Sequence, residues 1–152
     1  MAIIGIIYRH YERKSERDLE ARRKAGDYYM PLYGHIAVLD ELARGYKRSI
    51  EKGKAKVFAF KECRYDELTS KQILAEFKKA YDAFSSFYIK KKREGYEIFI
   101  SKKLKEFLSD FWIIAKNFYE DDKRMKDKRE IDDFHNSAEE ATSLMEKLFG
   151  LR

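Results

Sequence analysis

Three histidines and one cysteine are the residues of this sequence best suited to metal binding or nucleophilic catalysis. His10, His35 and His135 lie on separate segments, and the sequence contains no Glu-x-x-His, the pattern by which di-iron and di-manganese helical bundles hold their metals. The nearest pattern is Asp132 with His135. We therefore expect partly exposed histidines, no metal ligands and no resident cofactor.

Nucleophilic and acid–base chemistry is also unsupported by the residue spacing. Cys63 stands between Glu62 and Arg64, with no histidine close in sequence to act as its base, so we expect a small, semi-buried thiol. The carboxylate pairs at 121–122 and 132–133 are interpreted as solvated turn and cap residues. No Gly-rich phosphate loop opens a helix. The sequence predicts no catalytic residue, and we expect that the chain is not an enzyme.

A basic cluster is the first candidate for a binding surface. Lys90 to Arg93 are four consecutive cations, flanked by Tyr88, Tyr96 and Phe99. Cations beside aromatic rings are the ingredients of phosphate contact and base stacking, although the same cations also suit a solvated helix C-terminus. Nucleic-acid binding is therefore an alternative function. The candidate anion contacts are Arg22, Arg23, Lys90, Lys91, Lys92, Arg93, Lys102 and Lys103.

An apolar segment at the N-terminus is the second candidate. Residues 2–7 contain four isoleucines and are followed by residues 9–24, which carry seven basic and four acidic side chains. Leaving four isoleucines exposed would forgo on the order of 6–12 kcal/mol of hydrophobic free energy, so something should cover them. The candidate oligomer contacts are Ile3, Ile4, Ile6, Ile7 and Tyr11.

Three partners could cover this apolar segment. It could pack on its own bundle, against a second copy of the chain, or on a membrane surface, since apolar residues followed by basic ones match the inside flank of a membrane segment. Six residues are too few to span a bilayer. We favour a homo-oligomer in which the segment is buried against a partner chain.

A helix at residues 100–119 is the element around which the fold should be organised. Its apolar residues recur at steps of three and four and form two adjacent stripes, so at least two neighbours should contact it. The first stripe is Ile100, Leu104, Phe107, Phe111, Ile114 and Phe118, and the second is Leu108, Trp112, Ala115 and Tyr119.

The same periodicity predicts three further helices. One covers 27–52 and ends at Gly53, one covers 69–95, and one covers 127–150. Thr69 with Gln72, and Asp127 with Glu130, form capping boxes at the second and third starts. A single longer first helix from about residue 4, kinked at Pro31, is the alternative, but we favour a break or kink near residues 26–27. Residues 53–68 are expected to form an ordered loop over one bundle end, since no partner for a strand is evident.

These patterns predict an all-α fold, an antiparallel helical bundle of about four main helices plus an N-terminal helical arm. The domains are an apolar and basic arm at 1–26 and a bundle at 27–152. The net charge of +6 and the isoelectric point of about 9.2 raise the prior for an anionic partner, although acidic residues are interspersed with the basic ones. Many charged residues with few amides make the composition thermophile-like.

The function expected from these features is that of a non-enzymatic interaction or scaffold module that self-associates through its N-terminal arm. The alternatives are an accessory nucleic-acid-binding protein that uses the basic bundle end, and a membrane-peripheral domain. We expect a cytoplasmic protein, with the inner face of the membrane as the alternative position; one cysteine suits a reducing compartment.

Overall fold

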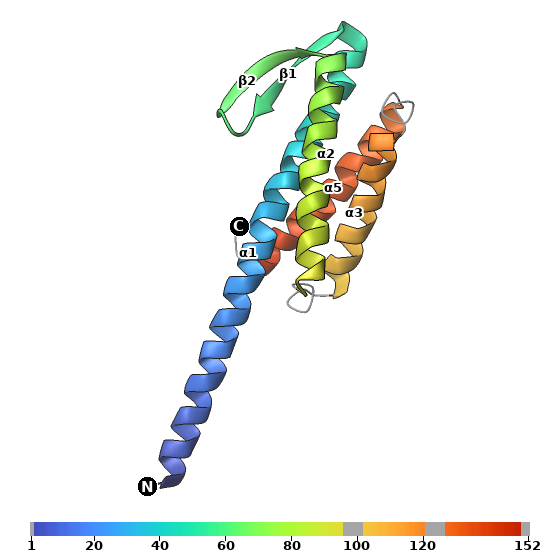
Figure 1. The fold of residues 1–152 in the computed structure, drawn as a ribbon. Coiled ribbons are helices and arrows are strands. Elements are labelled where there is room, and N and C mark those ends of the chain that lie inside the picture. Colours follow the sequence, from blue (N-terminus) through green and yellow to red (C-terminus); the bar gives the residue numbers. More distant parts are fainter. Residues whose placement is uncertain (1, 96–101, 121–126, 150–152) are drawn as a thin grey trace.

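The computed structural model describes residues 2–95, 102–120 and 127–149. Within these ranges side chains are described except at residues 2–15, 17, 18, 21, 22, 24, 25, 148 and 149. The described chain forms four helices and a two-stranded hairpin (Figure 1). The elements are α1 (Ala2–Lys52), β1 (Lys54–Ala59), β2 (Arg64–Thr69), α2 (Ser70–Arg93), α3 (Lys102–Glu120) and α5 (Lys128–Phe149).

The four helices form an antiparallel bundle, which confirms the main part of the predicted fold class. α1 packs against α2 and α5, and α3 packs against the same two helices from the other side. The predicted helix at 100–119 corresponds to α3 and has the two neighbours that its double stripe required. Its buried residues are Leu104, Leu108, Phe111, Ala115 and Phe118.

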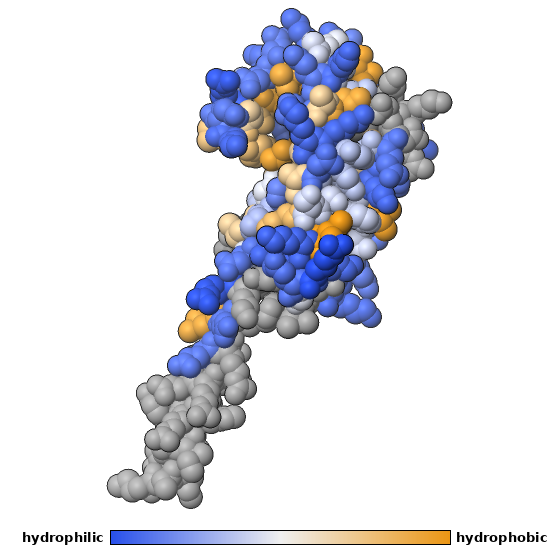
Figure 2. Space-filling view, in the orientation of Figure 1, coloured by the Kyte–Doolittle hydropathy of each residue, from blue (hydrophilic) through white to orange (hydrophobic). Residues whose placement is uncertain are grey.

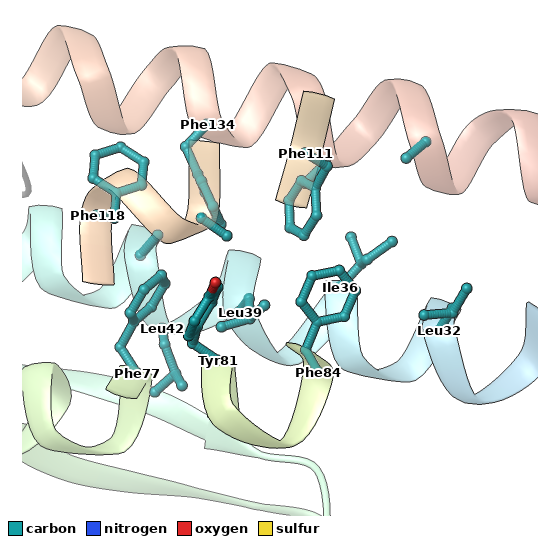
Figure 3. Packing of buried hydrophobic residues seen from close by; sticks show 14 of the residues in the cluster. Leu32, Ile36, Leu39, Leu42, Phe77, Tyr81, Phe84, Phe111, Phe118 and Phe134 are labelled. Carbon is teal, nitrogen blue, oxygen red and sulfur yellow. The ribbon is translucent and has the colours of Figure 1, made fainter. Parts of the chain in front are cut away.

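Aromatic rings fill the centre of the bundle (Figure 3). The Phe134 ring of α5 lies 5.1 Å from the Phe111 ring and 5.0 Å from the Phe118 ring, measured between centroids, and 5.9 Å from the Phe77 ring of α2. These four side chains are at most 1% exposed. Tilted and edge-to-face ring contacts add to the free energy of burial, so α2, α3 and α5 are joined through one ring cluster.

The first helix is continuous, so a break near residues 26–27 is wrong, and the alternative of a single longer helix that includes Pro31 is confirmed. α1 runs for 51 residues with Pro31 inside it. A proline within a helix costs about 3 kcal/mol, but Tyr28, Tyr29 and Leu32 on either side of it are almost fully buried. Burying three such side chains contributes roughly 1.5–3 kcal/mol each, which outweighs the cost of the proline.

Residues 54–69 form a β-hairpin, which corrects the predicted loop and adds a small sheet to the all-α fold class. β1 and β2 pair antiparallel, from Lys54 opposite Thr69 to Ala59 opposite Arg64. Val57 is buried against α1, whereas β2 alternates exposed and half-buried residues without an apolar run. The second strand was missed because its sequence, RYDELT, has only Leu68 as an aliphatic residue.

The helix ends follow local rules that the sequence displays. Gly53 and Gly95 have φ of 78° and 81°, the left-handed conformation that closes α1 and α2. The Thr69 hydroxyl accepts a hydrogen bond from the backbone N–H of Gln72 at 3.2 Å. The Gln72 side-chain oxygen accepts one from the backbone N–H of Thr69 at 2.9 Å. The predicted end of the first helix and the predicted capping box of the second are therefore confirmed.

Candidate interaction surfaces

The N-terminal part of α1 extends beyond the bundle as a single helix (Figure 1). Tyr28 is the first buried residue among the described side chains, and Leu19, further out, is 63% exposed. We call residues 2–27 of α1 the projecting arm. The side chains of the predicted oligomer contacts, Ile3, Ile4, Ile6, Ile7 and Tyr11, lie outside the description. Their contact with another chain stays a prediction.

A groove of about 550 Å³ lies between the hairpin, α1 and α2, at the other end of the molecule from the projecting arm. Figure 2 shows hydrophobic surface among the hydrophilic side chains at this end. We call this hollow the hairpin groove. Its apolar lining residues are Val38 and Leu42 of α1, Val57, Phe58 and Ala59 of β1, Phe60 of the turn, and Leu68 of β2.

The rim of the hairpin groove is mainly acidic. Glu62, Asp66 and Glu76 line it together with one cation, Lys61. The cations that pair with the rim carboxylates do not line the groove: Arg64 lies 3.1 Å from Asp66, and Lys79 lies 3.5 Å from Glu76. The groove therefore combines an apolar floor with carboxylates at its edge, two of which are paired with cations outside the groove.

Polar contacts with α1 hold the hairpin in place above this groove. The Glu41 carboxylate accepts bonds from the Phe58 amide at 3.3 Å and from Arg48 at 3.2 Å. Arg48 also donates to the Lys56 carbonyl at 2.7 Å. These bonds and the burial of Val57 fix the position of β1 on the helix, so the groove is formed in the isolated chain.

A close backbone approach explains the glycine in this part of α1. A Cβ atom built on Gly45 would lie 2.6 Å from a methyl carbon of Val57. β1 thus packs directly on the helix backbone, which no other residue at position 45 would allow without movement.

The predicted anion contacts are brought together only in part. α2 ends beside the start of α3, which places Lys90 to Arg93 near Lys102 and Lys103 (Figure 1). Arg22 and Arg23 lie further along the projecting arm, and the side chain of Arg22 is outside the description.

Several of these cations already lie against their own helix. Lys91 lies 3.3 Å from Glu94 and over the Phe87 ring, and Lys92 lies over Tyr88. Tyr88 is 5% exposed, so its ring offers no stacking surface, and Tyr96 and Phe99 lie outside the described residues. Anion or nucleic-acid binding at this end stays a prediction.

A histidine–carboxylate cluster joins α1 to α5 and was not anticipated from the sequence. His135 Nδ1 lies 2.8 Å from a carboxylate oxygen of Asp40, and its Nε2 lies 3.3 Å from Glu139. Burial raises the pKa of Asp40, and the hydrogen bond with His135 opposes that increase. Residues 40 and 135 are far apart in sequence, so no local pattern could indicate the pair.

Ion pairs between α1 and α5 cross the charged hollow beside this cluster. It is lined by Arg44, Lys47, Arg48, Glu51, Asp132 and His135. Lys47 pairs with Asp132, and Glu51 pairs with Lys128. The hollow is therefore a seam between helices in which opposite charges face each other.

The other residues considered for chemistry lie apart from one another. His35 packs against the Phe84 and Phe87 rings, and burial lowers its pKa. Cys63 lies in the hairpin turn and is exposed, so the expected semi-buried thiol is wrong. Over the described ranges, histidine, cysteine and carboxylate side chains do not gather in a group of three or more that could bind a metal ion.

Among residues 2–95, 102–120 and 127–149, no helix is long and apolar enough to cross a membrane. Comparisons with protein-family models, with curated proteins and with solved structures find no match.

Proposed function

We propose that this protein is a non-enzymatic interaction module that self-associates through the apolar segment at the end of its projecting arm. The observation that carries the proposal is the continuity of α1. One helix passes from the bundle to the segment at 2–7 and holds that segment away from the core (Figure 1). The bundle of the same chain is therefore not the surface on which the four isoleucines are expected to be buried.

The arm is suited to a contact at its tip rather than to a coiled coil along its length. Between residues 12 and 24 the only apolar side chains are Leu19 and Ala21. A coiled coil needs apolar residues at two positions of every heptad, and this stretch lacks them. The predicted contact is therefore limited to about the first three turns, residues 2–11, and polar residues separate it from the bundle.

The test is the mass of the particle in solution, measured by light scattering after gel filtration. The full chain should have a mass at least twice that of one chain, 18.2 kDa, and a variant without residues 2–10 should have the mass of a single chain. The double variant Ile4→Lys, Ile7→Lys should behave like the deletion. Leu19→Ser is the matched control, since it removes an exposed aliphatic side chain from the polar part of the arm and should leave the mass unchanged.

Two outcomes would contradict self-association. One is a full chain with the mass of a single chain. The other is an assembly that survives the loss of residues 2–10. Flotation with anionic phosphatidylserine vesicles tests the competing hypothesis of membrane contact. A single-chain protein that floats with vesicles only when residues 2–10 are present would favour membrane contact over self-association.

A further inference from the structure

We propose that the hairpin groove receives the N-terminal apolar segment of a second copy of this chain. This inference rests on the self-association proposed above and adds the surface that accepts the apolar segment. We call this segment and the residues that follow it, 2–14, the tip. Three features carry it: the distance between tip and groove within one chain, the match of their chemistry, and the exposure of the groove before it is occupied.

The tip of a chain is too far from its own groove to enter it. The segment at 2–7 and the hairpin, which follows Lys52, lie at opposite ends of the same helix (Figure 1). The lining of the groove begins at Val38 of α1, 31 residues beyond residue 7, and at about 1.5 Å per residue this is about 47 Å along the helix. Because α1 is continuous, the occupant must come from another molecule.

The chemistry of the tip complements that of the groove. The groove has an apolar floor that includes Phe58 and Phe60, and its rim carries three carboxylates and one cation. The tip offers isoleucines spaced by four residues at 3 and 7, followed by cations at 9, 13 and 14. An amphipathic helix that places such anchors in a hydrophobic groove is a common recognition mode, and the cations would lie at the rim, where its carboxylates could accept hydrogen bonds from them.

The groove also exposes a large apolar side chain in the isolated chain. Phe60 is 44% exposed although its ring lies 5.0 Å from that of Phe58. The contacts between Arg48, Glu41 and the β1 backbone hold the groove open without an occupant. A preformed apolar site loses little conformational entropy on binding, which favours association.

An interface between a tip and a groove is heterologous, because each chain contributes a different surface to each contact. Every chain has one of each, so copies join head to tail and form rings or open chains. This arrangement predicts complementation. A chain without a tip keeps its groove, a chain with a blocked groove keeps its tip, and the two should form one contact with each other.

The experiment measures mass by light scattering for two variants, alone and mixed in equal amounts. The first lacks residues 2–10, and the second is Phe60→Glu, which places a charge in the groove at a half-exposed position. Ile113→Glu is the matched control, since Ile113 of α3 is 48% exposed, similar to Phe60, and does not line the groove. Circular dichroism confirms that each variant is folded.

The expected result is that each variant alone has the mass of one chain, that their mixture has the mass of two, and that Ile113→Glu assembles like the full chain. If Phe60→Glu assembles like the full chain while the deletion does not, the groove is not the acceptor and self-association through the tips remains. If the deletion also assembles, or the full chain does not, both proposals fail. Single-chain masses in the mixture overturn the groove as acceptor.

Discussion

Replacing Gly45 with alanine should destabilise the protein, although alanine is the better helix former. Alanine in place of glycine within a helix gains about 1 kcal/mol. The new Cβ would lie 2.6 Å from a Val57 methyl carbon, and Val57 is 3% exposed and stiff about its first side-chain torsion. Overpacking of this kind costs roughly 1–3 kcal/mol, so the expected net loss is about 1 kcal/mol.

A double-mutant cycle isolates the contact. Val57→Ala alone removes two buried methyl groups and should cost about 2 kcal/mol. In that background Gly45→Ala should become stabilising by about 1 kcal/mol, since the clashing methyl groups are gone. The coupling between the two positions is then about 2 kcal/mol. The free energy of unfolding is measured by urea denaturation followed by circular dichroism.

Gly34→Ala provides the matched control on the same helix. Gly34 has no atom within 4 Å of an added Cβ, so this variant should gain about 0.5–1 kcal/mol. If Gly45→Ala stabilises the protein as much as Gly34→Ala does, or if the Val57 background leaves its effect unchanged, the hairpin does not pack on the α1 backbone as described.

Three other predictions concern stability. Burial lowers the pKa of His35 below its usual 6.5, so the folded state resists protonation and the free energy of unfolding falls as the pH drops below 6.5. His35→Gln should reduce this loss of stability in unfolding experiments at a series of pH values, and an unchanged dependence on pH would contradict the prediction. Cys63→Gly should raise the free energy of unfolding by about 0.5 kcal/mol, because Cys63 has φ of 51°; a decrease in urea denaturation would refute this. Thr69→Ala should cost about 1 kcal/mol through loss of the capping box and should lower the midpoint of thermal unfolding, with Ser86→Ala at an exposed position in the interior of the same helix as a comparison.

The bundle could be predicted because its signals are local. The steps of three and four in α2, α3 and α5 select the face of each helix that becomes buried, and Gly53, Gly95 and the Thr69–Gln72 box mark the helix ends. Each of these rules depends on neighbours in sequence, which a single sequence displays.

The continuous α1 and the hairpin depend on tertiary contacts and were therefore missed. Pro31 and Gly26 indicate a break by local rules, but the buried tyrosines at 28 and 29 hold the helix together. β1 is stabilised by the contact of Val57 with the backbone at Gly45, which no local pattern reveals. β2 then pairs with β1 in spite of its polar sequence.

The two surfaces of the proposed contact, the apolar segment and the hairpin groove, also differ in how far they can be predicted from the sequence. The isoleucines at 2–7 could be singled out from composition, because apolar residues next to a charged stretch need a partner. The hairpin groove is built by α1, the hairpin and α2 together, and its lining residues lie between positions 38 and 76. Such a surface exists only once the chain is folded.

The uninterrupted α1 fixes the distance between the bundle and the N-terminal end of the chain. In a head-to-tail series the distance from one bundle to the next would be set by the number of residues in α1. Seven additional residues in the polar stretch would lengthen this distance by about 10 Å, and because seven residues are close to two helical turns, the orientation of the tip would be nearly preserved. The protein would thus encode the spacing of an array in the length of a single helix.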